Sequence, residues 1–365
     1  MSKHNFGAGP CILPPSVLDR AAEAVKSWDA TGLSILEISH RSEAFEAVVK
    51  QTEELVRKLL NVPHDYCVLF LQGGASMQFC MVPLNFLQRS KREAVYLDAG
   101  HFGDKAIKEA KLIGKVNVIA SSRDRDYQDI PRDYKIPADA AYFHCTSNNT
   151  IEGTQLFKFP ETSVPVVCDM SSDIFSREID VSKFSLIYAG AQKNTGPAGM
   201  TLVIAKNSFL DSLRHPLPSM LDYRVHRDHG SMYNTPPVFA IYTAMLNLHW
   251  LQAKGGLKAI GLENKAKATL LYDEIDGNPL FHGSAVKWNR SLMNVTFRMY
   301  DQAKEKDFLN FAEKNGMVGI RGYRSVGGFR ASLYNALPLS SVHALVDCMK
   351  AYARKEVSHT FQPAY

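Results

Sequence analysis

The sequence predicts an α/β protein with a large, mostly parallel seven-stranded sheet, followed by a smaller α+β domain. Two patterns support this fold class. Between residues 67 and 205, short apolar and β-branched runs alternate with turns and helical stretches, as is typical of strands buried on both faces of a parallel sheet. Beyond about residue 257, alternating runs flank a helix instead. Ligands of open α/β sheets bind at the carboxyl ends of the strands, so functional side chains are expected there.

The elements of the larger domain follow in order along the chain. An amphipathic helix is expected from Ser42 to Leu60, where apolar residues recur at three- and four-residue spacing. The expected strands are Cys67–Leu71, Ala94–Leu97, Val116–Ala120, Ala141–His144, Val164–Cys168, Leu186–Tyr188 and Thr201–Ile204. A helix over Gly103–Ile113 follows the second of them. A long helix begins near residues 234–237, where Thr235 can cap it, and the glycine-rich stretch 254–256 ends it.

The smaller domain is expected to consist of strands and helices in alternation. These elements are strands Met293–Met299 and Phe329–Tyr334, a helix Asp301–Asn315 between them and a last helix Ser340–Arg354. We therefore expect a large domain at residues 16–256 and a small one at residues 257–365. The length of 365 residues agrees, because domains average roughly 150 residues.

Composition excludes several classes of protein. Hydrophobic residues make up 45% and charged residues 22%, which is typical of an ordinary folded protein. The net charge of +5 and pI of 8.7 fall short of a dedicated nucleic-acid binder, and no run of four or more basic residues is present. A nucleic-acid-binding or scaffold protein is thus the weaker, non-enzymatic alternative.

Cysteines and apolar stretches indicate the compartment. The 6 cysteines form no CxxC pair, so neither a metal site nor a disulfide framework is expected. The N-terminus lacks the apolar segment of a signal peptide, and residues 238–251 are too few to span a bilayer. We expect a cytoplasmic protein with reduced thiols and no membrane partner.

A lysine among small residues is the first candidate for chemistry. Lys193 lies in the segment 188–199, which follows one apolar run and precedes another. Small neighbours let a flat ligand approach the amine, and a desolvated lysine loses its proton more easily, as an imine-forming nucleophile must. A solvated turn lysine is the alternative for this residue considered alone.

An acid and a glycine turn accompany this lysine. Asp169 ends the preceding apolar run, where a carboxylate can hold the pyridine nitrogen of pyridoxal phosphate protonated. Alternatively, Asp169 caps a helix, because Ser171 and Ser172 follow. Residues 69–78 contain a strand, the pair Gly73–Gly74 and an apolar helical stretch, whose first amides can bind phosphate. The order of these three motifs predicts a pyridoxal phosphate site.

Over essentially its whole length, the chain resembles the phosphoserine aminotransferases, class V pyridoxal-phosphate enzymes of the aspartate-aminotransferase fold (fold type I). The segments that carry the resemblance are residues 5–10, 36–41, 73–75, 149–150, 189–194, 196–199 and 327–335. Of these, Ala-Gly-Ala-Gln-Lys-Asn and Arg-Ala-Ser-Leu-Tyr-Asn are the most specific. The resemblance also implies that residues 1–15 pack on the small domain.

The resemblance implies roles for the residues around the cofactor. Lys193 would bind the cofactor covalently and then transfer the proton at the α-carbon of the substrate. Asp169 would hold the pyridinium, Thr150 would contact the phenolic oxygen and Gln192 would lie close to the cofactor. Phe102 occupies the position of the stacking ring, where many members have tryptophan.

The cofactor phosphate would be bound from two subunits. By the resemblance, Ala75 and Ser76 would donate backbone amides to it, and Asn234 and Thr235 would reach the phosphate of the neighbouring subunit's cofactor. The resemblance therefore implies a homodimer with shared active sites.

Substrates charged at both ends call for arginines, which bind carboxylate or phosphate with paired hydrogen bonds. By the family pattern, Arg330 would bind the α-carboxylate, and His40, Arg41, Tyr323 and Arg324 would bind the distal carboxylate or phosphate. Many relatives have histidine in place of Tyr323, and tyrosine can donate one hydrogen bond but cannot become cationic. His40 can equally be a polar residue ahead of the following helix.

The function implied is a phosphoserine:2-oxoglutarate aminotransferase of serine biosynthesis. It would transfer an amino group reversibly between glutamate and 3-phosphohydroxypyruvate. The alternative is another fold type I aminotransferase or a cysteine desulfurase-like enzyme, although no cysteine lies on an evident mobile loop. Use of the related phosphorylated acid of pyridoxine biosynthesis stays open.

Overall fold

The large sheet has seven strands, and the computed structural model describes residues 3–213, 215–324 and 326–360. The strand order is β2 (Tyr66–Leu71), β10 (Thr201–Lys206), β9 (Leu186–Gly190), β8 (Val166–Asp169), β5 (Tyr142–Thr146), β3 (Ala94–Asp98) and β4 (Val116–Ser121). Only β10 runs antiparallel to its neighbours. The expected mostly parallel seven-stranded sheet is therefore confirmed.

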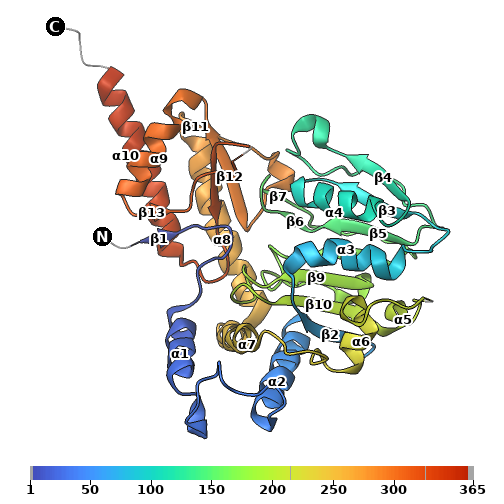
Figure 1. Cartoon of the computed structure of the whole chain (residues 1–365). Helices are drawn as coiled ribbons and strands as arrows, with labels where there is room; N and C mark the ends of the chain where they lie inside the picture. Colours follow the sequence, from blue (N-terminus) through green and yellow to red (C-terminus); the bar gives the residue numbers. More distant parts are fainter. Residues whose placement is uncertain (1–2, 214, 325, 361–365) are drawn as a thin grey trace.

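Helices cover both faces of this sheet (Figure 1). One face packs against α1 (Pro15–Lys26), α2 (Glu43–Leu60) and α7 (Val238–Ala253). The other packs against α3 (Gly74–Phe86), α4 (His101–Lys111) and α6 (Tyr223–Asp228), and α5 (Asn207–Leu210) follows β10. Successive strand residues alternate between the two cores, as Phe70 and Leu71 do, because side chains point to opposite faces. Both faces are apolar, which explains the continuous apolar runs.

A second, smaller sheet belongs to a separate core. Its strands are β11 (Phe281–Gly283), β12 (Asn294–Met299) and β14 (Phe329–Ser332), in that order. They pack with α8 (Gly256–Gly277), α9 (Glu305–Lys314) and α10 (Leu339–Thr360). Near the N-terminus, β1 (His4–Asn5) pairs with β13 (Met317–Val318), and a hairpin of β6 (Asn148–Asn149) and β7 (Thr154–Gln155) follows β5.

Helix α8 connects the two cores. Leu257 and Ile260 in its first turns belong to the core of the large sheet, whereas Leu271 and Ile275 belong to the core of the small one. Phe6, from the N-terminal segment, also lies in the small core. The division at residue 257, with 1–15 in the small domain, stays a prediction that this distribution of core residues supports.

Two local features differ from expectation. Thr235 does not cap α7, because Pro237 is the N-cap residue and the helix begins only at Val238, whose backbone N–H donates to the carbonyl of Pro236 at 2.8 Å. Helix α8 has no counterpart among the expected elements, because Asn264 and Lys267 are buried on its inner face and interrupt an apolar stripe.

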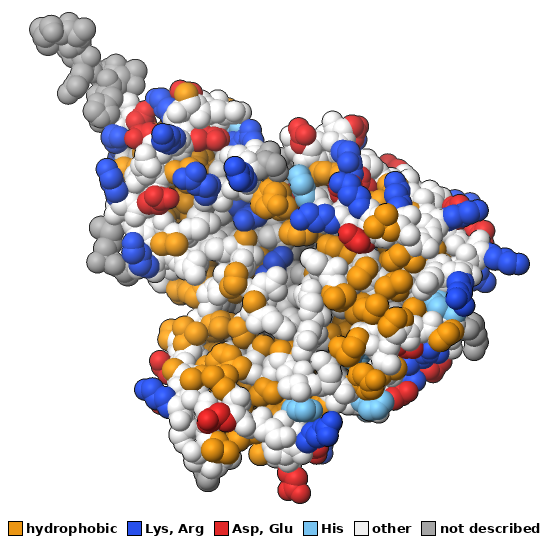
Figure 2. Space-filling view, in the orientation of Figure 1, with side chains coloured by type: hydrophobic (Ala, Val, Ile, Leu, Met, Phe, Trp, Pro, Cys, Tyr) orange, Lys and Arg blue, Asp and Glu red, His pale blue; other side chains and the backbone are white. Residues whose placement is uncertain are grey.

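The surface shows a concentration of apolar side chains on one face. In Figure 2, hydrophobic side chains gather over α3 and around α1 and α7. Leu18 of α1 and Met77 of α3 are among the exposed large apolar residues. No helix in the described ranges is long and apolar enough to cross a membrane.

Candidate active site

The candidate catalytic residues lie at the carboxyl edge of the large sheet. Asp169 is the last residue of β8, and Lys193 lies in the turn after β9. These strands are parallel neighbours, with Asp169 opposite Tyr188. Thr150 follows the β6 strand beyond the end of β5. The topology thus brings the three residues to one edge.

Lys193 is a buried amine with a hydroxyl partner. Its side chain is 8% exposed, and Nζ donates to Thr150 Oγ1 at 2.7 Å. Burial, helped by the positive charge of Arg330 and opposed by Asp169, lowers the pKa of Lys193 to about 8. The lowered pKa enlarges the unprotonated fraction of the amine, which is the form that a nucleophile requires.

Asp169 is buried and held in a fixed orientation. Its Oδ1 accepts hydrogen bonds from the backbone N–H of Ser171 at 2.9 Å and from its hydroxyl at 2.6 Å. Burial raises the pKa of Asp169, while these hydrogen bonds and the charge of Lys193 lower it. The alternative that Asp169 caps a helix is wrong, because residues 171–175 form turns and no helix; Oδ1 instead holds this turn, and Oδ2 is left for a ligand.

The start of α3 has the backbone geometry of an anion-binding turn, and its phosphate-binding role stays a prediction. Gly73 precedes the helix with φ 91°, a conformation that favours glycine, and the first-turn amides of Ala75 and Ser76 have no intrahelical partner. Gln72 Nε2 donates to the carbonyl of Thr235 at 2.9 Å. This places the segment with Asn234 beside the turn of the same chain.

An aromatic ring completes the site. Phe102 lies in the first turn of α4, and its ring centroid is 5.6 Å from Lys193 Nζ. Gln192 is half-buried next to Lys193, and its carbonyl accepts from the backbone N–H of Cys11 at 3.0 Å. The structure therefore brings Phe102, Gln192 and Thr150 together with Lys193.

A cavity of about 670 Å³ adjoins these residues. It lies between the start of α4 and the small sheet, and its lining includes Tyr323 and Arg330 but not Lys193. Arg330 connects the cavity to Lys193. Its Nη1 donates at 3.3 Å to the carbonyl of Thr150, and the hydroxyl of Thr150 accepts from Lys193. Burial lowers the pKa of Arg330, and its Nε is buried without a partner in the described ranges. Thr150 thus links the Lys193 amine to Arg330 at the edge of the cavity.

Three predicted residues are not brought to this cavity. His40 and Arg41 precede α2 and are outside the cavity lining, and Arg41 is exposed. Arg324 is exposed next to Tyr323 and is not a lining residue either. Their substrate roles stay predictions.

Other charged residues of the cavity were missed from the sequence. His101 Nδ1 lies 2.5 Å from Glu152 Oε1, which also accepts from the backbone N–H of His101. Glu152 raises the pKa of His101 through this hydrogen bond, although partial burial opposes the shift. Arg298 of β12 is a further lining residue. The sequence signal that could have revealed this pair is proximity to predicted site residues. His101 directly precedes Phe102, and Glu152 closely follows Thr150.

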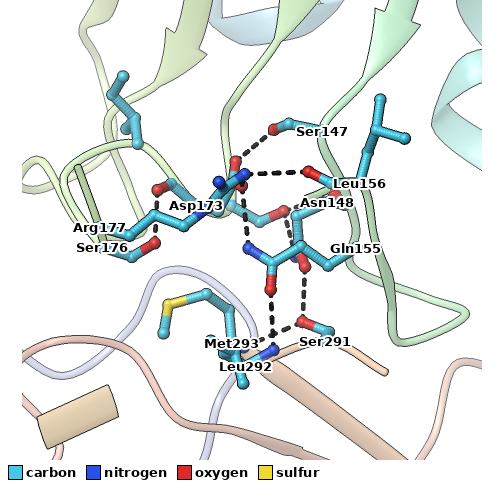
Figure 3. Close-up of polar contacts among 12 residues, drawn as sticks. Ser147, Asn148, Gln155, Leu156, Asp173, Ser176, Arg177, Ser291, Leu292 and Met293 are labelled. Atoms are coloured by element: carbon cyan, nitrogen blue, oxygen red, sulfur yellow. Dashed lines mark hydrogen bonds and ion pairs between the residues drawn. The ribbon is translucent and has the colours of Figure 1, made fainter. Parts of the chain in front are cut away.

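A buried polar network supports the edge of the sheet from behind (Figure 3). Asp173 accepts hydrogen bonds from Ser147, from Gln155 at 3.0 Å and from Arg177 at 3.3 Å. Gln155 in turn accepts from the backbone N–H of Leu292 at 2.9 Å, which belongs to the small domain side. The network also reaches the strand end, because the hydroxyl of Ser147 donates to the carbonyl of Asp169 at 3.1 Å.

These residues fit pyridoxal phosphate. They provide a buried amine with lowered pKa, a buried carboxylate with one free oxygen, unpaired amides for a phosphate and a ring for stacking. Each feature is a property of this structure and matches one part of that cofactor.

Known proteins share this arrangement. The family model for class-V aminotransferases matches residues 4–345. The phosphoserine aminotransferase of Bacteroides thetaiotaomicron is 55% identical over 97% of this chain and 99% of its own, and that of Flavobacterium johnsoniae is 55% identical over 97% and 100%. The solved phosphoserine aminotransferase of Bacillus circulans subsp. alkalophilus superposes with a TM-score of 0.95 at 45% identity, covering 97% of this chain and 99% of that one. A pyridoxal-phosphate-bound phosphoserine aminotransferase from Trichomonas vaginalis gives 0.91 at 38% identity, covering 95% and 99%. This chain belongs to the class-V aminotransferase family.

Proposed function

We propose that this protein is a pyridoxal-phosphate-dependent phosphoserine aminotransferase. It transfers an amino group reversibly between glutamate or 2-oxoglutarate and 3-phosphohydroxypyruvate or O-phosphoserine. The observation that carries the proposal is the position of Lys193, whose Nζ lies 2.7 Å from Thr150 Oγ1 at the sheet edge, next to an arginine-lined cavity. The relatives of that name, with more than half of their residues identical, support the substrate assignment.

The residues divide the chemistry between them. When bound, pyridoxal phosphate supplies an electron sink for the carbanion at the α-carbon. Lys193 takes the proton from the α-carbon of the substrate as a base and later gives the proton up as an acid. Its lowered pKa favours both steps at neutral pH. Asp169 holds a proton on the ring nitrogen through its free oxygen. Phe102 would stack on the cofactor ring, and Gln192 would lie close to it.

Phosphate and substrate are held by separate groups. Ala75 and Ser76 donate backbone amides to the cofactor phosphate at the start of α3. Arg330 binds the α-carboxylate, because its buried Nε has no protein partner in the described ranges. Tyr323 lines the cavity, and by the family pattern it would bind the second anion together with Arg324, which lies outside the lining.

We further propose a homodimer with shared active sites. His40 and Arg41 lie outside the cavity of their own chain, so a substrate role for them requires a second subunit. By the family pattern, Asn234 and Thr235 would reach the phosphate of the partner's cofactor, while the carbonyl of Thr235 accepts from Gln72 of its own chain. The apolar surface over α3 and around α1 and α7 suits such an interface (Figure 2).

The proposed location is the cytoplasm, and the proposed pathway is serine biosynthesis, with pyridoxine biosynthesis as a second route. All six cysteines are free thiols, which agrees with a reducing compartment. A desulfurase is disfavoured, because burial raises the pKa of Cys11, the thiol beside Lys193, to about 12.

Two measurements test this proposal. Borohydride reduction of the yellow holoenzyme should leave a pyridoxyl group on the peptide that contains Lys193. O-phosphoserine should react with 2-oxoglutarate far faster than serine does. A colourless protein that takes up no added cofactor contradicts the enzyme class, and equal rates with serine contradict the substrate.

A further inference from the structure

One face of the small sheet presents two arginines to the cavity. Thr296 of β12 is paired with Arg330 of β14, and Arg298 is paired with His282 of β11. Residues two apart on a strand point to the same side, so these four side chains share one face, and all four line the cavity. Arg298 and Arg330 are diagonal neighbours, which are about 7–8 Å apart at the backbone.

Arg298 has spare hydrogen-bonding capacity. Its one hydrogen bond among the described residues runs from Nη2 to the carbonyl of Val326, and no carboxylate there pairs with it. The cavity's third arginine differs, because Arg123 is paired with Asp98 and Asp104. Guanidinium groups facing a cavity without an acid are suited to bind a carboxylate or phosphate.

The acids of the cavity do not compete for Arg298. Glu152 is paired with His101, and Asp104 is paired with Arg123 and Lys108. The remaining lining acid, Asp126, is exposed. Among the described residues, no acid of the cavity forms an ion pair with Arg298 or Arg330, although the charge of Glu152 acts on Arg330.

Arg298 also lies beneath the loop that carries Tyr323. A Cβ atom added to Gly328 would come within 2.7 Å of Arg298 Cγ, and one added to Gly327 within 3.3 Å of Nη2. Both glycines have positive φ. The loop thus approaches the Arg298 side chain closely, which places the guanidinium at the end of the cavity that Tyr323 borders.

We propose that Arg298, flanked by His282, binds the distal anion of the substrate while Arg330 binds the α-carboxylate. This inference rests on the proposed transaminase function and adds a specificity-determining residue to it. The ligand is a small dianion, whose phosphate or side-chain carboxylate lies against Arg298. Tyr323 cannot carry a positive charge, and Arg298 of the small sheet supplies that charge instead.

The test compares Arg298→Gln and Arg298→Lys in the holoenzyme. Hydrogen bonds to charged groups contribute enough that kcat/KM for O-phosphoserine should fall roughly 10- to 100-fold in Arg298→Gln, mainly through KM. Inhibition by inorganic phosphate should weaken in parallel. The rate with serine at high concentration should stay within about twofold, because serine has no distal anion. Arg298→Lys keeps the charge and should lose less.

The control is Arg321→Gln, which removes one positive charge from an exposed side chain near the same loop and outside the cavity lining. It should leave kcat/KM for O-phosphoserine within about twofold.

Two outcomes for Arg298→Gln overturn the inference. Equal losses with serine and O-phosphoserine would show that Arg298 only supports the loop. An unchanged kcat/KM would show that Arg298 neither supports the loop nor binds the substrate. If Arg298→Gln does not fold, the same comparison in Arg298→Lys decides. Failure of the proposed function is distinguishable, because the unsubstituted protein would then bind no cofactor or would convert serine as fast as O-phosphoserine.

Discussion

At the edge of the large sheet, Lys193 and Asp169 are buried and hydrogen-bonded, and each has a pKa moved by burial. On the face of the small sheet, Arg298 and Arg330 are half-buried and face an open cavity with donors to spare. The first region adjusts protonation, and the second supplies positive charge. Changes at the sheet edge should therefore reduce turnover, and changes on the small sheet should weaken substrate binding.

The largest effect is expected from Lys193→Ala. Loss of the proton-transferring amine should reduce kcat at least about 1000-fold, while some cofactor stays bound through its phosphate and ring contacts. Steady-state rates and the absorbance of the bound cofactor measure both. Normal turnover would refute the role of this residue.

A matched control is available in the second buried lysine. Lys267 of α8 also has its pKa lowered to about 8 by burial, but its Nζ donates to the carbonyls of Tyr334 and Leu337 at 2.9 and 3.1 Å. Lys267→Met should lower the free energy of unfolding by about 1–3 kcal/mol and leave kcat within about twofold. Urea unfolding of the holoenzyme measures the loss.

Asp169→Asn should have the next largest effect. An amide keeps the hydrogen bonds to Ser171 in part but cannot hold a proton on the ring nitrogen, so kcat should fall roughly 100-fold or more. Asp169→Glu retains the charge and should recover part of the rate. A wild-type kcat in Asp169→Asn would show that the carboxylate only stabilises the turn at Ser171 and does not act on the cofactor.

On the small sheet, Arg330→Lys should act on binding of every substrate. Lysine cannot form the paired hydrogen bonds to the α-carboxylate, so kcat/KM should fall roughly 10- to 100-fold for O-phosphoserine, glutamate and serine alike. This pattern contrasts with Arg298→Gln, which should spare serine. A loss confined to doubly charged substrates would exchange the roles of the two arginines.

The smallest effect is expected for the pair His101 and Glu152. The pKa of His101 is raised in the folded protein, so the pair stabilises fully below the pKa of the unfolded residue, about 6.5, and the contribution is lost as pH rises through the raised value. His101 is partly exposed, so water screens the pair and the change is about 0.5 kcal/mol or less. Glu152→Gln should lower the pKa of His101 in an NMR titration and flatten the decline in stability above pH 6.5. An unchanged titration would exclude the coupling.

Much of the large domain could be predicted because its signals are local. Strand β8 ends in Asp169 and β9 leads into the turn with Lys193, so the order of motifs along the chain already indicated their common edge. Helix α8 could not be predicted from the sequence, because buried Asn264 and Lys267 interrupt its apolar face. Their partners, such as Asn335 and the carbonyl of Tyr334, lie far along the chain.

The sequence by itself determined the fold class, the lysine, the acid and the phosphate-binding turn, because each depends on residues close together in the chain. Only the tertiary structure decided which charges face the cavity. The pairing of Glu152 with His101 and the spare donors of Arg298 depend on how two sheets are placed against each other. An arginine becomes a binding group only where no carboxylate neutralises it, and that is settled by packing rather than by local sequence.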